Sequence, residues 1–234
     1  MFAIYKREMR AYFTTPIGYV FAAIFLAFSA AVFTYSTLYS LSSDTSTYFT
    51  VMLFSFIILV PLLTMKTLSE ERKMKTEQLL LTSPVSLTGM VVAKFLAAFT
   101  VFFGCILLTS LNFIILYTHS EPNTAMILGN LLALILVGMS FLAIGIFVSS
   151  LTESQLAASV ITVGILLVLM VISFANTLIG VPWIRFLLSG LSVYARFQNF
   201  ANGIFDVAAL VYYLSLTALF LFLTVRVYDR RRFA

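Results

Sequence analysis

Residues 126–150, with the sequence MILGNLLALILVGMSFLAIGIFVSS, contain no acidic or basic side chain over 25 consecutive positions. About 20 such residues in an α-helix cross a hydrocarbon core that is about 30 Å thick. The apolar residues run without the alternation of a β-barrel strand, so the backbone must satisfy its own hydrogen bonds as a helix. This stretch therefore predicts a membrane-spanning helix, and it decides the fold class.

The rest of the chain has the same character. Five more apolar runs reach a similar length, near residues 17–38, 49–67, 89–118, 156–179 and 207–228. Hydrophobic residues make up 62% of the 234 positions and charged residues 10%, with a mean hydropathy of +1.07. Soluble domains have roughly 45–50% apolar and roughly 25% charged residues, so a soluble globule is excluded. We predict an all-α integral membrane protein with six transmembrane helices in a single domain, residues 1–234.

The distribution of lysine and arginine predicts the orientation in the membrane. Six spans place both termini on one side, and 12 of the 14 Lys and Arg residues fall on that side, whereas Arg185 and Arg196 fall on the other. Cytoplasmic loops retain positive charge during insertion, so we predict that both termini are cytoplasmic. Topology and attraction to anionic membrane lipids then explain the net charge of +5, and no basic groove rich in aromatic residues indicates a nucleic-acid partner.

The first 15 residues predict an amphipathic helix that lies in the membrane interface. Apolar and aromatic residues recur at helical spacing, and basic residues occupy the other side. The residues that characterise this interfacial helix, residues 1–15, are Lys6, Arg7, Arg10 and Tyr12. Thr15 is expected as the N-cap of the first span and Pro16 in its first turn. A frayed basic tail is the alternative, and the periodicity disfavours it.

Few side chains inside the predicted spans carry ionic groups. Lys66 and Lys94 lie near span ends, where each can extend its ammonium group to the interface. Gly129, Gly138 and Gly145 in the fourth span and Gly164 in the fifth predict close packing against neighbouring helices.

Two connections between spans have predictable forms. Residues 151–154 join the fourth and fifth spans, and so short a connection predicts a tight antiparallel hairpin. Residues 180–206, before the sixth span, predict a partly re-entrant helical hairpin on the outer side, with an ordinary amphipathic surface loop as the alternative.

The sequence contains no motif for catalysis. A Gly-x-x-x-x-Gly-Lys phosphate loop, a His-Glu-x-x-His zinc motif, a Gly-x-Ser-x-Gly elbow and a dinucleotide fingerprint are all absent. A metal role for the single histidine, His119, would require further ligands nearby, and the single cysteine, Cys105, is expected to be an apolar filler. We therefore expect no catalytic residue, no metal and no cofactor in this chain. A membrane protein without its own ATP or coupling-ion site is passive, structural or driven from outside.

Residues 69–85, SEERKMKTEQLLLTSPV, form the one dense charged stretch between apolar spans. Thr76 can cap a short helix over residues 77–81, with the acidic Glu77 at its positive end. Three consecutive leucines then give this helix an apolar face that suits a groove in a soluble protein. A solvated basic loop that only fixes the topology is the alternative, but it does not explain the leucines. The residues that we expect to couple the chain to such a partner are Glu70, Glu71, Arg72, Thr76, Glu77, Leu79, Leu80 and Pro84.

This charged segment resembles that of the membrane subunits of type-2 ABC exporters. Their pattern after the second span is Glu-Glu-Arg, two variable residues, Gly-Thr, an acidic-Leu-Leu stretch and Pro-Val, and Lys75 stands where the family usually has glycine. The carboxyl-terminal part is similar to that of the gliding-motility-type subgroup. The residues that carry this second resemblance in the outer hairpin are Phe197, Phe200, Gly203 and Asp206.

The resemblance implies a transmembrane subunit of an ATP-driven exporter. A separate ABC ATPase subunit, which binds ATP and Mg, would push on a cytoplasmic coupling helix, and an unidentified substrate would move outward. The resemblance also implies a second permease subunit, either an identical copy or a close paralogue, and a location in the bacterial cytoplasmic membrane. In some members of the subgroup it further implies an auxiliary extracytoplasmic protein. The alternative is a non-transporting mechanotransmission or scaffold subunit that relays ATPase movement to an extracytoplasmic partner. A continuous solvent path between spans one, two and five would favour transport.

Overall fold

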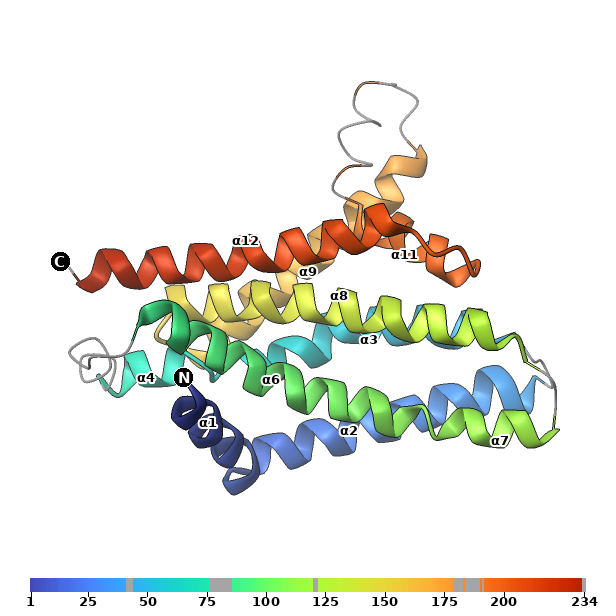
Figure 1. The fold of residues 1–234 in the computed structure, drawn as a ribbon, viewed down its shortest axis with the longest axis horizontal. Helices are drawn as coiled ribbons and strands as arrows, with labels where there is room; N and C mark the ends of the chain where they lie inside the picture. The colour runs from blue at the N-terminus through green and yellow to red at the C-terminus, as the bar shows by residue number, and fades with distance from the viewer. Residues whose placement is uncertain are drawn as a thin grey trace.

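The computed structural model describes residues 1–40, 44–75, 86–119, 122–178, 183, 190 and 192–232. All regular secondary structure in these ranges is helical, which confirms the all-α prediction (Figure 1). The helices are α1 Phe2–Thr14, α2 Pro16–Phe33 with the π-helical extension η1 Thr34–Tyr39, α3 Ser46–Thr64, α4 Ser69–Lys73, α6 Leu87–Thr109, α7 Asn112–His119, α8 Thr124–Leu151, α9 Gln155–Leu178, α11 Val193–Ala201 and α12 Val207–Arg232.

Six stretches within the described ranges are long and apolar enough to cross a membrane. They are Pro16–Tyr39, Ser46–Lys73, Leu87–Thr118, Thr124–Leu151, Gln155–Ser173 and Val207–Arg232. Their order and number match the six predicted spans. The second, third and fourth stretches are the most buried and form the centre of the bundle, while the first, fifth and sixth lie at its periphery.

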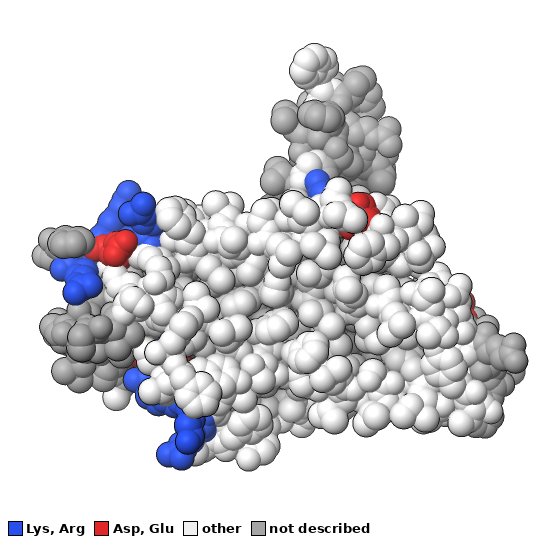
Figure 2. All heavy atoms as spheres, in the orientation of Figure 1, with Lys and Arg blue, Asp and Glu red and all other residues white. Residues whose placement is uncertain are grey.

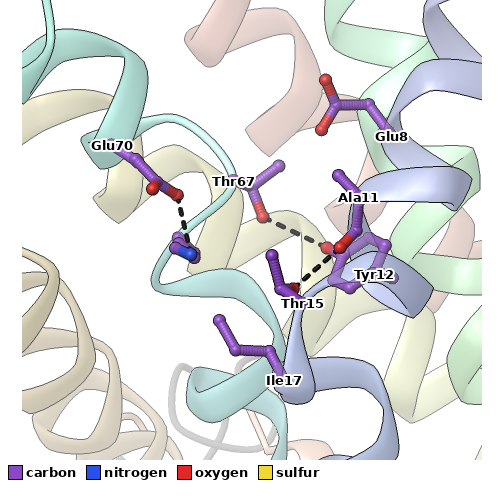
Figure 3. Close-up of a pocket in the computed structure, with 8 residues that line it drawn as sticks. Glu8, Ala11, Tyr12, Thr15, Ile17, Thr67 and Glu70 are labelled. Carbon is purple, nitrogen blue, oxygen red and sulfur yellow. Dashed lines mark hydrogen bonds and ion pairs between the residues drawn. The ribbon is translucent and has the colours of Figure 1, made fainter.

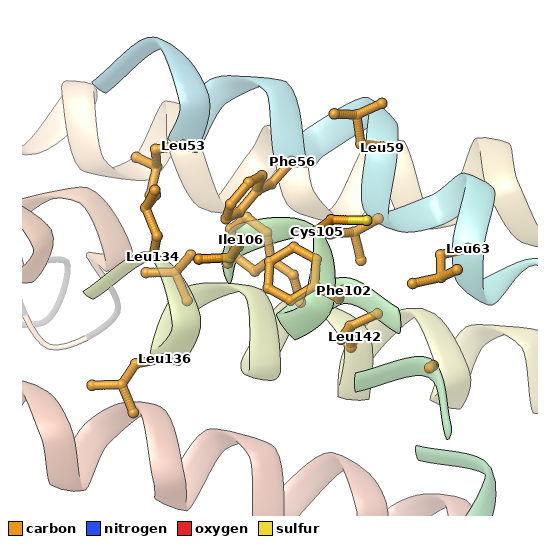
Figure 4. Packing of buried hydrophobic residues seen from close by; sticks show 14 of the residues in the cluster. Leu53, Phe56, Leu59, Leu63, Phe102, Cys105, Ile106, Leu134, Leu136 and Leu142 are labelled. Carbon is orange, nitrogen blue, oxygen red and sulfur yellow. The ribbon is translucent and has the colours of Figure 1, made fainter. Parts of the chain in front are cut away.

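Helix α8 is the central element of the bundle, packed against α3, α6, α9, α11 and α12. Phe102 of α6 lies between α3 and α8 in the apolar core, beside Phe56, whose ring centroid is 5.1 Å from its own (Figure 4). A Cβ atom added to Gly138 would overlap the Phe102 ring, and one added to Gly145 would overlap the Thr64 side chain. The predicted close packing is thus confirmed for these two glycines. A Cβ atom on Gly129 would make ordinary contact with the Phe200 carbonyl at 3.5 Å, and one on Gly164 would meet no described atom within 4 Å, so the prediction is wrong for Gly164 within this chain.

The third span is broken, although its sequence predicts one continuous helix. Between α6 and α7 the backbone N–H groups of Leu111 and Phe113 donate to the carbonyls three residues earlier, at 3.2 and 3.1 Å. The hydroxyls of Thr109 and Ser110 donate to the carbonyls of Ile106 and Leu107 at 2.8 and 2.6 Å. Such bonds tighten a helix locally and bend it without proline or glycine.

Both chain termini lie at the same end of the bundle, together with α4 and the turn between α8 and α9 (Figure 1). Figure 2 shows that Lys and Arg side chains gather at this end. We call it the basic end. The other end carries α7, the start of α8, and α11 with its single arginine, Arg196.

Candidate functional site

The described part of the predicted coupling segment begins with α4, which follows a turn after α3. Ser149 of α8 holds this turn in place, because its Oγ accepts the N–H groups of Leu68 and Ser69, both at 3.1 Å. The same hydroxyl donates to the Met65 carbonyl at 3.3 Å. The turn interrupts the helical hydrogen bonds of the second span, and a buried serine from a neighbouring helix replaces them.

Four ionised side chains meet beside α4, and we call them the ion cluster: Arg7 and Glu8 of α1, Glu71 of α4 and Lys94 of α6. Lys94 Nζ lies 2.9 Å from Glu71 Oε1 and 3.1 Å from Glu8 Oε1. Arg7 Nη2 lies 2.7 Å from Glu8 Oε1 and 2.8 Å from Glu71 Oε1. Two cations and two carboxylates thus connect three helices.

The sequence predicted that Lys94 extends its ammonium group to the membrane interface, and this prediction was wrong. Its side chain is only 1% exposed, and it also donates to the Thr67 carbonyl at 2.9 Å. An ammonium group has three donors, and here all three find acceptors inside the protein. Two carboxylates at ion-pair distance offset the cost of removing the charge from water.

Arg7 occupies the outer side of the ion cluster, with its side chain about half exposed. Partial burial would lower the pKa of this guanidinium, but its hydrogen bonds and charge interactions with Glu8 and Glu71 outweigh burial and raise the pKa above its ordinary value. Arg7 was predicted as a residue of the interfacial helix. The structure places it in contact with the predicted coupling segment.

Glu8 and Lys94 were not predicted as site residues. One signal in the sequence points to Glu8, because it is the single acidic residue among the first 15 and stands three positions after Tyr5 and four before Tyr12. It therefore lies on the apolar face of α1. A carboxylate on that face requires a buried cationic partner, but the sequence does not tell which cation provides it.

Arg72 connects α4 to the turn between α8 and α9. Its Nε lies 3.1 Å from Glu153 Oε1, and its Nη1 donates to the Leu151 carbonyl. Arg231 of α12 donates to the neighbouring Ser150 carbonyl at 2.7 Å. Helix α8 ends at Leu151 and α9 begins at Gln155, which confirms the predicted tight hairpin.

A cavity of about 210 Å³ lies between α1 and the α3–α4 turn (Figure 3). Glu70 lines it and pairs with Lys66 at 3.2 Å, four residues earlier. Tyr12, on the opposite wall, donates its hydroxyl to the Leu63 carbonyl at 3.2 Å. Burial raises the pKa of Tyr12 to about 12, so the phenol stays neutral and anchors α1 to α3.

Thr15 occupies the predicted N-cap position of α2, and Pro16 is the first helical residue. The Thr15 hydroxyl, however, donates to the Ala11 carbonyl at 2.7 Å. It closes the end of α1 instead of capping α2. Lys6 and Arg10, the other predicted residues of the interfacial helix, lie exposed on α1.

The remaining predicted coupling residues lie outside the described residues: Thr76, Glu77, Leu79, Leu80 and Pro84. The last described residue before them, Lys75, has φ 55°. An L-residue adopts this left-handed conformation at a cost that glycine avoids. The glycine usual at this position in the type-2 ABC exporters that the segment resembles fits the same backbone.

The four residues predicted for the outer hairpin surround the junction of α11 and α12. Phe197 and Phe200 are fully buried, and Gly203 has φ 76°. Asp206 accepts hydrogen bonds from Asn199 Nδ2 at 2.7 Å and the Ala208 N–H at 2.8 Å. These hydrogen bonds lower the pKa of Asp206 below its ordinary value, and the bond from Asn199 contributes most. Much of the predicted segment, 180–182, 184–189 and 191, lies outside the described residues.

Arg196 of α11 packs beside this junction, with its guanidinium carbon 4.1 Å from the centroid of the Tyr212 ring. Its Nη1 also donates to the Ala208 carbonyl at 3.5 Å, so Arg196 and Asp206 both connect α11 to the first turn of α12. We find only packing and helix capping among these residues. Within the described ranges, no group of three or more His, Cys, Asp and Glu side chains is arranged to hold a metal ion.

Residues 33–227 match the family model described as ABC-2 family transporter protein. The match covers most of the chain, so the protein belongs to this family of ABC transporter membrane proteins. A comparison with curated proteins found no match. Membership of the family implies an ABC ATPase partner and association with a second permease subunit. The gliding-motility-type subgroup stays a prediction.

Proposed function

We propose that this chain is the transmembrane subunit of an ATP-driven exporter, which moves its substrate outward when a separate ATPase subunit pushes on residues 69–85. Family membership supports the permease role. The observation that carries the coupling role is the ion cluster, because it joins α4 to α1 and α6 through side chains that are largely buried.

The ion cluster is suited to transmit movement because it resists opening. Removal of one partner from a buried ion pair costs about 3–5 kcal/mol, since the other charge is left without compensation. A force on α4 therefore displaces α1 and α6 together with it. Arg72 extends the same connection to the α8–α9 turn through Glu153. The more exposed pair of Lys66 and Glu70 lies within one segment and contributes little to this connection.

The predicted coupling residues then have two roles. Glu71 and Arg72 contact other parts of this chain, so we assign them to transmission. Glu70 pairs with Lys66 within its own segment and is assigned to neither role. The contact with the ATPase falls to the segment that follows, in which the leucines would enter a groove of the partner. The residues assigned to this contact are Thr76, Glu77, Leu79, Leu80 and Pro84.

The surroundings of the chain follow from this assignment. ATP and Mg bind to the partner ATPase, and the basic end faces the cytoplasm of a bacterial cell, so both termini are cytoplasmic. A second permease copy completes the transporter, and an auxiliary extracytoplasmic protein is an additional expected partner. The placement of most cations at one end supports the orientation.

Two variants of the chain co-expressed with its ATPase separate contact from transmission. Leu80→Asp should abolish co-purification of the ATPase, whereas Leu156→Asp, at an exposed position near the same end, should leave it unchanged. The double variant Arg7→Gln with Glu8→Gln should retain the ATPase, because Lys94 keeps Glu71 as a partner while α1 loses its ionic connection to α4. Lys6→Gln with Arg10→Gln on the exposed face of α1 is its control.

Spin labels at the exposed positions Leu111 and Ile204, in a Cys105→Ala background, report movement at the far end. Addition of ATP and vanadate should shift their distance distribution in the unmodified complex and in the control variant. The shift should disappear in the Arg7→Gln and Glu8→Gln variant. An unchanged shift there would refute transmission through the ion cluster, and retained co-purification of Leu80→Asp would refute the ATPase contact.

A further inference from the structure

The bend in the third span directs α7 toward α2 and α3. Phe113, in the first turn of α7, packs against Phe33 of α2 and against Tyr48 and Phe49 of α3, with centroid distances of 5.7, 5.4 and 5.4 Å. Asn112 donates to Ser29 at 3.4 Å, and Ser29 Oγ lies 2.8 Å from the Tyr48 hydroxyl. These contacts hold α7 on one side and leave space on the side of α8.

A second cavity, of about 630 Å³, occupies this space between α6–α7 and α8. Ile106, Phe113 and Ile127 form its floor and are less than 5% exposed, whereas Leu107 and Leu128 form its rim and are more than half exposed. The cavity therefore extends from a buried floor to an exposed rim on the side of the helix bundle. Its lining is apolar except for Ser110, Tyr117 and Thr124, and the Tyr117 hydroxyl donates to Thr124 Oγ1 at 3.0 Å.

The occupant of this cavity must be hydrocarbon. Water gains too few partners in an apolar cavity to stay there, and an empty cavity loses the dispersion contacts of its lining. The rim continues into Leu111 and Ile114, which are exposed apolar residues on a membrane span. The cavity is thus continuous with an exposed apolar surface of a stretch that is long and apolar enough to cross a membrane.

The cavity is elongated along α8. Its α8 side runs from Thr124 to Leu136, which is about 18 Å at 1.5 Å per residue. An acyl chain is apolar along its whole length, and it suits an apolar lining of this length.

The position along the span fits one leaflet of the bilayer. Leu136 lies near the middle of α8, and Thr124 is its first residue. Half of a hydrocarbon core of about 30 Å is about 15 Å, close to the length of the cavity. The hydroxyls of Tyr117 and Thr124 lie at the end nearest the interface, where the polar backbone of a phospholipid begins.

We propose that the cavity between α6–α7 and α8 binds one acyl chain of a membrane phospholipid from the leaflet farther from the basic end. This site does not depend on the proposed ATPase coupling. The bound chain fills the volume that the bend at Ser110 and Leu111 creates.

The test uses the full-length protein in nanodiscs that contain phosphatidylethanolamine with a diazirine on its acyl chain. After illumination, mass spectrometry should place the label mainly within residues 103–136, and native mass spectrometry in detergent should show one retained phospholipid per chain. Leu131→Trp fills the cavity and should lower the retained lipid about fivefold or more. Leu219→Trp, at an exposed position of α12, should leave it unchanged.

Three results would overturn the proposal. The first is a label as frequent on α12 as on α6–α8, which indicates contact with surrounding lipid only. The second is equal lipid retention in the two tryptophan variants. The third combines two observations: the cavity residues carry no label, and a Leu107→Cys variant forms disulfides between two copies of the chain. The second copy would then occupy the cavity. The labelling of the unmodified protein decides the question even when Leu131→Trp does not fold.

Discussion

The two ends of the bundle are held together by different kinds of contact. At the basic end, ionised side chains join α1, α4 and α6 within one buried cluster. At the opposite end, aromatic rings of α2, α3 and α7 pack beside a large apolar cavity. Charge pairs that are removed from water permit few alternative arrangements. Apolar contacts are individually weak and tolerate repacking. Contacts at the basic end therefore hold their helices in one arrangement, whereas contacts at the opposite end tolerate changes in packing.

The largest expected effect comes from loss of the buried ammonium group. Lys94→Met should lower the free energy of unfolding by about 3–5 kcal/mol, because Glu8 and Glu71 would then lose their fully buried cation and retain the half-exposed Arg7 as a partner. Unfolding in SDS, followed by circular dichroism, measures the change. Lys66→Met is the control and should change stability by about 1 kcal/mol at most, since its pair with Glu70 is partly exposed. Equal effects of the two substitutions would contradict the importance of the ion cluster.

A smaller effect is expected from the serine that holds the α3–α4 turn. Ser149→Ala leaves the Leu68 and Ser69 N–H groups without their acceptor and should cost about 1–3 kcal/mol. The same unfolding assay applies. Ser159→Ala, at a half-buried position of α9 where the hydroxyl donates to the Leu156 carbonyl of the same helix, should stay within about 0.5 kcal/mol of the unmodified protein. A neutral Ser149→Ala would show that the turn is held by other contacts.

At the opposite end, the polar contact between α2 and α3 should matter less. Tyr48→Phe removes the hydroxyl that bonds to Ser29 but retains the ring in its aromatic cluster. Ser29 keeps its bond from Asn112, so we expect a loss of about 0.5–1.5 kcal/mol. If this loss exceeded that of Ser149→Ala, the contrast between the two ends would be reversed.

The smallest expected change is a gain. Lys75→Gly should stabilise the chain by about 0.5–1 kcal/mol, because glycine adopts the left-handed backbone at this position without the steric cost of a Cβ. Lys73→Gly, within α4, should instead destabilise it by about 1 kcal/mol. Opposite signs for two lysines only two residues apart would confirm the backbone conformation, and equal signs would exclude it.

The sequence predicted the fold because long apolar runs leave one solution in a bilayer, as in residues 126–150. The packing role of Gly138 and Gly145 also followed from residue type. The bend at Ser110 did not, because no proline or glycine marks it, and serine and threonine hydroxyls make similar bonds within the unbroken helices α8 and α12. The ion cluster was missed since a charge pattern does not specify which residues from α1, α4 and α6 meet in space. For the same reason the contacts of Glu71 and Arg72 within this chain were not foreseen, and their predicted role in coupling to the ATPase stays a prediction.

Lys94 serves the chain at two different times. While the ribosome delivers the nascent polypeptide to the membrane, Glu8 and Lys94 have not yet met, and the lysine counts among the cations that retain its flank in the cytoplasm. After folding, the same charge is hidden and neutralised. In the proposed orientation, one side chain first helps to choose the topology and later locks the finished structure, so its replacement should produce two separable defects, inverted molecules and loosely assembled ones.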